Sequence, residues 1–148
     1  MKYGNVRLFS PAALFTALTL SLSNPAIGHA QSFAMEAKVP FEFYVGKVCL
    51  PAGSYTVERA GVSGGVIRVA DNQGHSVMIL TNASSNAGSG VTSELVFNRY
   101  ADSFFLSEVR WSDFRIARSV RASSPERELA RTAKSHRVIV AAAHIQSE

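Results

Sequence analysis

The chain has 148 residues, of which 47% are hydrophobic, 9% aromatic and 18% charged, which is typical of one globular domain and excludes a disordered or collagen-like chain. Its single cysteine excludes an internal disulfide framework and a cysteine-based zinc site. The formal net charge of +4 falls to +2 if Lys2 and Arg7 are removed with an N-terminal signal, so we expect no nucleic-acid partner.

The first thirty residues have the features of a secretory signal peptide. After the basic start comes the apolar stretch Pro11–Leu22, and the small residues Gly28 and Ala30 stand where a signal peptidase cuts. This stretch is shorter than the roughly 20 residues that a membrane-spanning helix needs. We therefore expect residues 1–30 to be a cleaved signal and residues 31–148 to form one exported domain, in the periplasm, at the cell surface or outside the cell, with no transmembrane segment after cleavage.

The mature chain begins with a clear strand pattern. Apolar residues occupy every second position from Phe33 to Val45, with charged residues between them, as in a strand with one buried face. Phe41 and Phe43 are expected to point into the core. Pro40 cannot donate to a ladder, so this strand is expected to lie at an edge or to be bulged there.

Further strands follow at short intervals, separated by turn residues. They are expected over Val48–Leu50, Ser54–Arg59, Val66–Ala70, His75–Thr81, Glu94–Tyr100, Phe104–Trp111 and Val138–Ala143, the last one either buried on both faces or paired with the first strand. The segment Asn82–Thr92 is poor in large apolar residues and is expected to be a surface loop.

One helix is expected before the last strand. Ser123 can cap it, Pro125 suits its first turn, and basic residues stand near its end at about Ser135. Glu126 is expected to be exposed, while Leu129, Ala130 and Ala133 form the only possible buried stripe. The pattern as a whole predicts an all-β, mainly antiparallel domain, a compact β-sandwich or β-barrel of seven to nine strands with one short helix near the C-terminus.

No motif identifies a catalytic, metal or cofactor site, so we expect none. The histidines show no metal-ligand spacing, and Asp71, His75 and Ser76 are interpreted as turn residues rather than a catalytic triad. Cys49, between Val48 and Leu50, is expected to be a small buried hydrophobe, although a reactive thiol or a bridge between chains is an alternative.

The basic segment around Arg110, Arg115, Arg118 and Arg121 is the best candidate for a binding surface. Arginine can hold phosphate, sulfate or carboxylate groups in two hydrogen bonds at once, so an anionic envelope component or a protein partner is possible. The alternative is that these side chains are solvated or paired with nearby carboxylates, which is common at protein surfaces.

Several ordered blocks of residues resemble small exported acidobacterial proteins of unknown function. The blocks are Val39–Phe43 with Gly46, Leu50–Val57, Leu95–Tyr100 and Glu126–Ala130. The resemblance implies a bacterial origin and a single unit, but it brings no activity, cofactor or catalytic residue. Cys49 departs from it, since a polar or charged residue is expected at that position.

Three functions remain open at this stage. The first is a non-enzymatic exported binding or cell-envelope interaction module. The second is a β-barrel carrier or enzyme with an apolar interior pocket lined by Phe41, Phe43, Phe97 and Phe105. The third is a structural subunit that assembles through its edge strands.

Overall fold

The computed structural model describes residues 33–61, 63–85 and 91–145; the expected signal peptide, residues 1–30, and part of the expected loop, residues 86–90, lie outside them. The strands are β1 Ala34–Val39, β2 Phe43–Val45, β3 Val48–Leu50, β4 Gly53–Ala60, β5 Val66–Asp71, β6 Ser76–Ser84, β7 Ser93–Tyr100, β8 Ser103–Trp111, β9 Ile116–Val120 and β10 His136–His144. One helix, α1, covers Ser124–Thr132.

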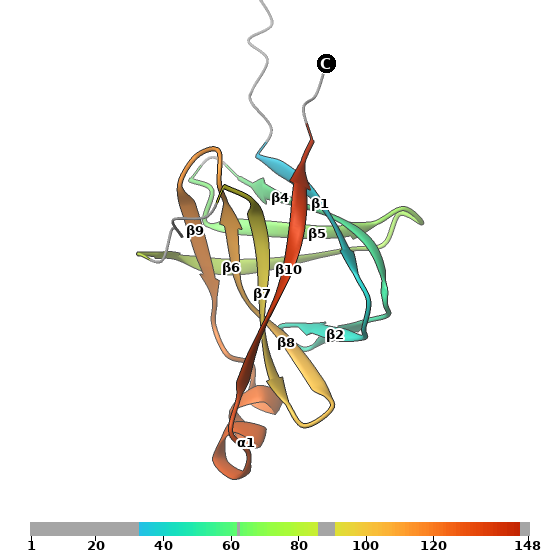
Figure 1. The fold of residues 1–148 in the computed structure, drawn as a ribbon, viewed down its shortest axis with the longest axis vertical. Helices are drawn as coiled ribbons and strands as arrows, with labels where there is room; N and C mark the ends of the chain where they lie inside the picture. Colours follow the sequence, from blue (N-terminus) through green and yellow to red (C-terminus); the bar gives the residue numbers. More distant parts are fainter. Residues whose placement is uncertain (1–32, 62, 86–90, 146–148) are drawn as a thin grey trace, which may run out of the picture.

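Eight of the strands close into a barrel (Figure 1). Their order around it is β8-β7-β10-β1-β4-β5-β6-β9, and β9 closes the ring by pairing with β8. All of these pairings are antiparallel; the short hairpin β2–β3 is outside the ring and joins β8 through a parallel contact between Tyr44 and Phe105. The expectation of an all-β domain with one C-terminal helix is confirmed, as a barrel.

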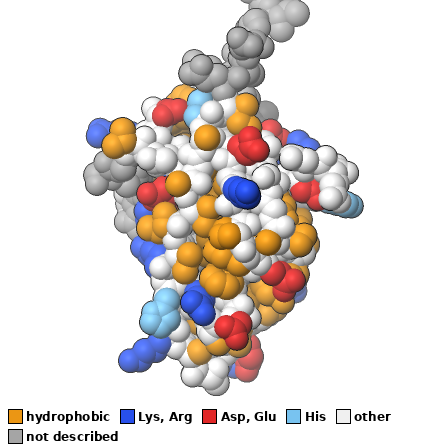
Figure 2. Space-filling view, turned by 45° about the vertical axis from the view of Figure 1, so that its right-hand side comes forward, with side chains coloured by type: hydrophobic (Ala, Val, Ile, Leu, Met, Phe, Trp, Pro, Cys, Tyr) orange, Lys and Arg blue, Asp and Glu red, His pale blue; other side chains and the backbone are white. Residues whose placement is uncertain are grey.

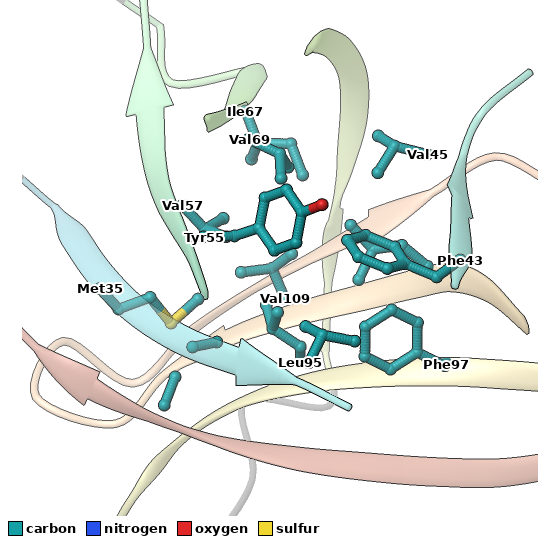
Figure 3. Close-up of a cluster of buried hydrophobic side chains, with 14 of the residues drawn as sticks. Met35, Phe43, Val45, Tyr55, Val57, Ile67, Val69, Leu95, Phe97 and Val109 are labelled. Carbon is teal, nitrogen blue, oxygen red and sulfur yellow. The ribbon is translucent and has the colours of Figure 1, made fainter. Parts of the chain in front are cut away.

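The core fills the barrel interior with side chains from alternate positions of its strands. Figure 3 shows aromatic residues from β2, β4 and β7 in contact: Phe43 packs edge-on against Tyr55 and Phe97, with ring centroids 5.1 and 5.3 Å apart. Met35 and Leu95 also lie in this cluster and are fully buried. The period-two pattern of the sequence therefore identified the inward face correctly.

The first expected strand is broken at Pro40. β1 ends at Val39 and the chain resumes as β2 at Phe43, so Pro40 follows a central strand rather than lying within an edge strand. The expectation of an edge or bulge was wrong, because the missing N–H of proline ends the ladder there. Phe43 is fully buried, whereas Phe41 is half-buried and stacks on Phe104 at 3.9 Å.

The chain after β5 differs from expectation in three places. β9 was not expected, and β6 continues to Ser84, into the segment that was expected to be a loop. β10 pairs with β1 and β7, as one alternative held, but Ile139 on its outer face is 52% exposed, so the strand is not buried on both faces.

The helix is shorter than expected, and its buried residue is a carboxylate. α1 ends at Thr132, and Ser123 caps it by accepting a hydrogen bond from the Glu126 N–H. Glu126 is only 4% exposed, and its carboxylate accepts a hydrogen bond from the Asn98 side chain of β7 at 2.9 Å. The expectation that Glu126 is exposed was therefore wrong, and a polar contact ties the helix to the barrel.

Candidate functional site

An open pocket of about 640 Å³ lies at the end of the barrel where β4 begins and β5 turns into β6. One wall is apolar and comes from β3 and the turn after it, including Val48, Leu50 and Ala52. The opposite wall is polar and comes from the β5–β6 turn: Asp71, Asn72, Gln73, His75 and Ser76. A volume of this size is within the range of small-molecule sites.

The local sequence explains how the polar wall is held. The Asp71 carboxylate accepts hydrogen bonds from the backbone N–H groups of Gln73 and His75, both at 2.9 Å, and its other oxygen lies 2.9 Å from Nδ1 of His75. The contact with the His75 side chain, together with these N–H groups, holds the pKa of Asp71 below its usual value. Asp71 is thus used to build the turn, as interpreted from the sequence, while the His75 side chain stays 74% exposed.

The apolar wall rests on Tyr55, which is fixed by its hydroxyl. Tyr55 is 2% exposed and donates a hydrogen bond from its hydroxyl to the Pro51 carbonyl at 2.7 Å. This bond joins the turn before β4 to the core (Figure 3 shows Tyr55 among the buried side chains). The pocket is therefore built on an ordered end of the barrel.

Cys49 lies at the pocket and is exposed, so the expectation that it is buried was wrong. It pairs with Tyr44 across the β2–β3 hairpin, and this places it on the face opposite to the buried Phe43. Partial desolvation and the neighbouring Glu42 carboxylate raise the pKa of the thiol. A raised pKa lowers the share of the reactive thiolate, which is unfavourable for nucleophilic chemistry.

The four arginines singled out by the sequence are not brought together. Arg110 is on the outer face of the barrel, where it binds the carboxylates of Glu108 and Glu94 at 2.9 and 3.2 Å. Arg118 is on the inner face, beside Val109 of β8, and donates to the Gly64 carbonyl. A spacing of three residues gathers side chains on one face of a helix but alternates them between the faces of a strand.

The other two arginines are exposed. Arg115 lies in the β8–β9 turn with a positive φ of 50°, and Arg121 follows the end of β9. On the face of the molecule in Figure 2, basic and acidic side chains are interspersed around a central group of apolar ones. That view therefore shows no extended surface of positive charge.

The four phenylalanines expected to line an interior pocket do not do so. Phe41, Phe43 and Phe97 pack against one another in or beside the core. Phe105 lies on the opposite face of β8 from the core residue Leu106 and stacks on Tyr44 at 4.9 Å. The barrel interior at this level is filled by aromatic packing.

Searches against known protein families, curated proteins and solved structures find no match for the chain. Within the described residues, no three or more His, Cys, Asp or Glu side chains are grouped so as to hold a metal ion. No helix in the described part of the chain has the length and apolar character to span a membrane.

Proposed function

We propose that the chain is an exported, non-enzymatic binding protein whose ligand occupies the pocket between β3 and the β5–β6 turn. The observation that carries this proposal is the pairing of an apolar wall with a polar wall of amide, hydroxyl, imidazole and carboxylate groups around about 640 Å³ of open space. Such a pocket suits a small organic ligand with an apolar body and hydrogen-bonding groups on one side.

The chemistry at the pocket favours binding over catalysis. The Cys49 thiol has a raised pKa, and the Asp71 carboxylate is used by the turn that it stabilises. Neither group is activated as a nucleophile or base. Export rests on the sequence features of residues 1–30, and N-terminal sequencing of the protein recovered outside the cytoplasm should give Gln31 as the first residue.

Cys49 provides the test of the pocket, because it is the only cysteine in the chain. The reaction rate of its thiol with a disulfide reagent should fall, with saturation, as N-acetyl-leucinamide is added. This probe combines an apolar side chain with two neutral amide groups. Replacing Ala52, an exposed pocket residue, by Trp should abolish the effect, whereas Ala141→Trp, at an exposed position on β10, should leave it unchanged.

The opposite result would overturn the proposal. In that case the reaction rate of the unmodified chain does not depend on the probe, and native mass spectra of the exported protein contain only the chain without a ligand. Together these results would show that the pocket does not bind a ligand.

A second candidate is self-assembly through an edge, which one feature of β6 favours. Within the described residues β9 pairs with Thr81–Ser84, so the first half of β6 has no hydrogen-bonded strand on that side. Met78 and Leu80 in this half are 64% and 76% exposed. An exposed apolar edge can pair with another copy; sedimentation velocity should then show a dimer that Met78→Lys dissociates and that Ile139→Lys does not.

A further inference from the structure

The barrel end opposite the pocket carries two arginines that meet at one glycine. Arg118 donates to the Gly64 carbonyl through Nε at 2.9 Å and also through Nη2. The guanidinium of Arg59 lies against the Cα of Gly64, since any side chain at this position would overlap it. We call Arg59, Gly64 and Arg118 the arginine rim.

Arg59 reaches the rim because of its place on β4. Tyr55 and Val57 are buried on the inner face of this strand, and Arg59 is the next residue on the same face, at the end of the barrel. Its guanidinium carbon lies 4.5 Å from the centre of the Phe33 ring. Arg59 thus places a positive charge at an inward-facing position of β4.

No carboxylate neutralises the arginine rim among the described residues. The guanidinium of Arg59 makes no hydrogen bond or ion pair there, and its Nε is buried without a partner. The neighbouring Glu58 points to the outer face and binds Arg68 at 2.7 Å. Two guanidinium groups beside the same residue repel each other, and a buried donor without a partner is unfavourable. A bound anion would remove both costs, because it supplies the negative charge and the hydrogen-bond acceptor.

A second, independent observation points to the same end of the barrel. Trp111 is the last residue of β8, lies on its inner face and is fully buried, yet its indole Nε1 has no hydrogen-bond partner. Nδ1 of His144, the last residue of β10, is also buried and unpartnered apart from a 3.6 Å approach to Asp113. The ends of β4, β8 and β10 meet at one end of an antiparallel barrel, so the unsatisfied nitrogens of the described residues gather there.

We propose that the arginine rim is the binding site of a small oxyanion, held between Arg59 and Arg118. The guanidinium of Arg59 donates no hydrogen bond among the described residues, and its planar fork matches two oxygens of a carboxylate or phosphate group. Arg118 is oriented by Gly64 and adds a second positive charge. The site lies at the far end of β4 from the proposed ligand pocket, so either site can exist without the other.

The test uses Trp111 as a reporter, because it is the only tryptophan in the chain and lies at the same barrel end. The purified chain is titrated with sodium phosphate and, separately, with sodium acetate, at an ionic strength held constant with sodium chloride. We expect a saturable change in tryptophan fluorescence and a rise in Tm with at least one of the two anions. The anion that binds at the lower concentration identifies the oxyanion class.

Three variants separate binding from folding. Arg59→Gln should weaken binding at least tenfold and lower Tm only slightly in the absence of anion, because the Arg59 guanidinium makes no hydrogen bond or ion pair among the described residues and the variant loses only its contact with the Phe33 ring. Arg118→Gln should also weaken binding, but it can lower Tm because it loses its bonds to Gly64. Arg121→Gln, which makes the same charge change at an exposed position beyond β9, should leave the titration unchanged.

Two results would overturn the proposal. One is a fluorescence and Tm response to phosphate and acetate no larger than that to chloride. The other is a saturable response that persists unchanged in Arg59→Gln, which would place the anion elsewhere.

Discussion

At the scale of single residues, Phe41 and Phe43, which follow Pro40, differ in how deeply they are buried in the core. Phe43 is fully buried between Tyr55 and Phe97, so Phe43→Ala should lower the free energy of unfolding by about 3–5 kcal/mol. Phe41 is half-buried, and its replacement should cost less, about 1–3 kcal/mol. Urea titration measures both, with the exposed Glu42→Ala as the control; equal losses for the two phenylalanines would contradict the packing described.

Asp71 should make the free energy of unfolding depend on pH. Its pKa is lowered in the folded protein by the His75 side chain and by backbone N–H groups, so its contribution to stability is present above the unfolded-state value of about 3.9 and is lost as the pH falls through the folded-state value. Asp71→Asn should therefore flatten the fall in the free energy of unfolding below about pH 4. Urea titrations over this range measure it, and the exposed Asp102→Asn is the control; an unchanged slope in Asp71→Asn would contradict the turn geometry.

At the scale of elements, the tip of the β2–β3 hairpin is fitted to β6. Gly46 has a φ of 64°, and a Cβ there would lie 2.9 Å from Cδ1 of Ile79. Gly46→Ala should cost more than about 1 kcal/mol, and more than Gly74→Ala, whose φ is also positive but whose surroundings are open. Ile79→Val removes the overlapping methyl group, so it should recover part of the loss in Gly46→Ala. If urea titrations of the double variant show no recovery, the hairpin tip does not pack against Ile79 of β6 as described.

A partly buried polar pair, Asn98 and Glu126, links α1 to β7. Glu126→Ala leaves Asn98 without its partner and should lower the free energy of unfolding by about 1–3 kcal/mol. Glu128→Ala, on the exposed side of the same helix, should change it by about 0.5 kcal/mol or less. The double variant Asn98→Ala, Glu126→Ala should cost less than the sum of the single changes. Additive losses would show that the pair does not hold the helix to β7.

At the scale of the whole molecule, the sequence predicted an all-β, mainly antiparallel domain, with a sandwich and a barrel as alternatives, because most of its strands have one buried face. The alternation from Phe33 to Val45 and the turn residues before β4 and between β5 and β6 were sufficient to locate those strands. The helix was found from its cap residues, although the role of Glu126 depends on Asn98, which is distant in the sequence.

The candidate sites were harder to predict, because they depend on contacts across the barrel. β9 was missed because Arg118 occupies an inward position, where its guanidinium reaches Gly64 at the open end of the barrel. The inward position of Arg59 could have been predicted, since Arg59 follows Tyr55 and Val57 at every second position along β4. The pocket joins β3 to the β5–β6 turn, and no local pattern indicates that these segments face each other.

The closure of the barrel leaves an uneven edge on β6. The backbone bonds Asp71 N–H to His75 O and Thr81 N–H to Gly65 O fix which residues of β6 bond to β5. In this register Val77 and Ile79 belong to hydrogen-bonded pairs, while Ser76 and Met78 belong to the non-hydrogen-bonded pairs between them. The N–H groups of Ser76 and Met78 therefore point away from β5, toward the side on which β9 pairs only from Thr81 onward.

This register predicts an alternation in amide hydrogen exchange along β6. The amides of Val77 and Ile79 should be protected by their bonds to β5, whereas the amides of Ser76 and Met78 should exchange quickly, as exposed edge amides do. Further along the strand, the amide of Asn82 should be protected as well, because β9 pairs there. Residue-resolved exchange followed by NMR at low protein concentration measures the pattern. Protection of Met78 that grows with concentration would indicate pairing of β6 with a second copy, and equal protection of Met78 and Val77 at all concentrations would contradict the free edge.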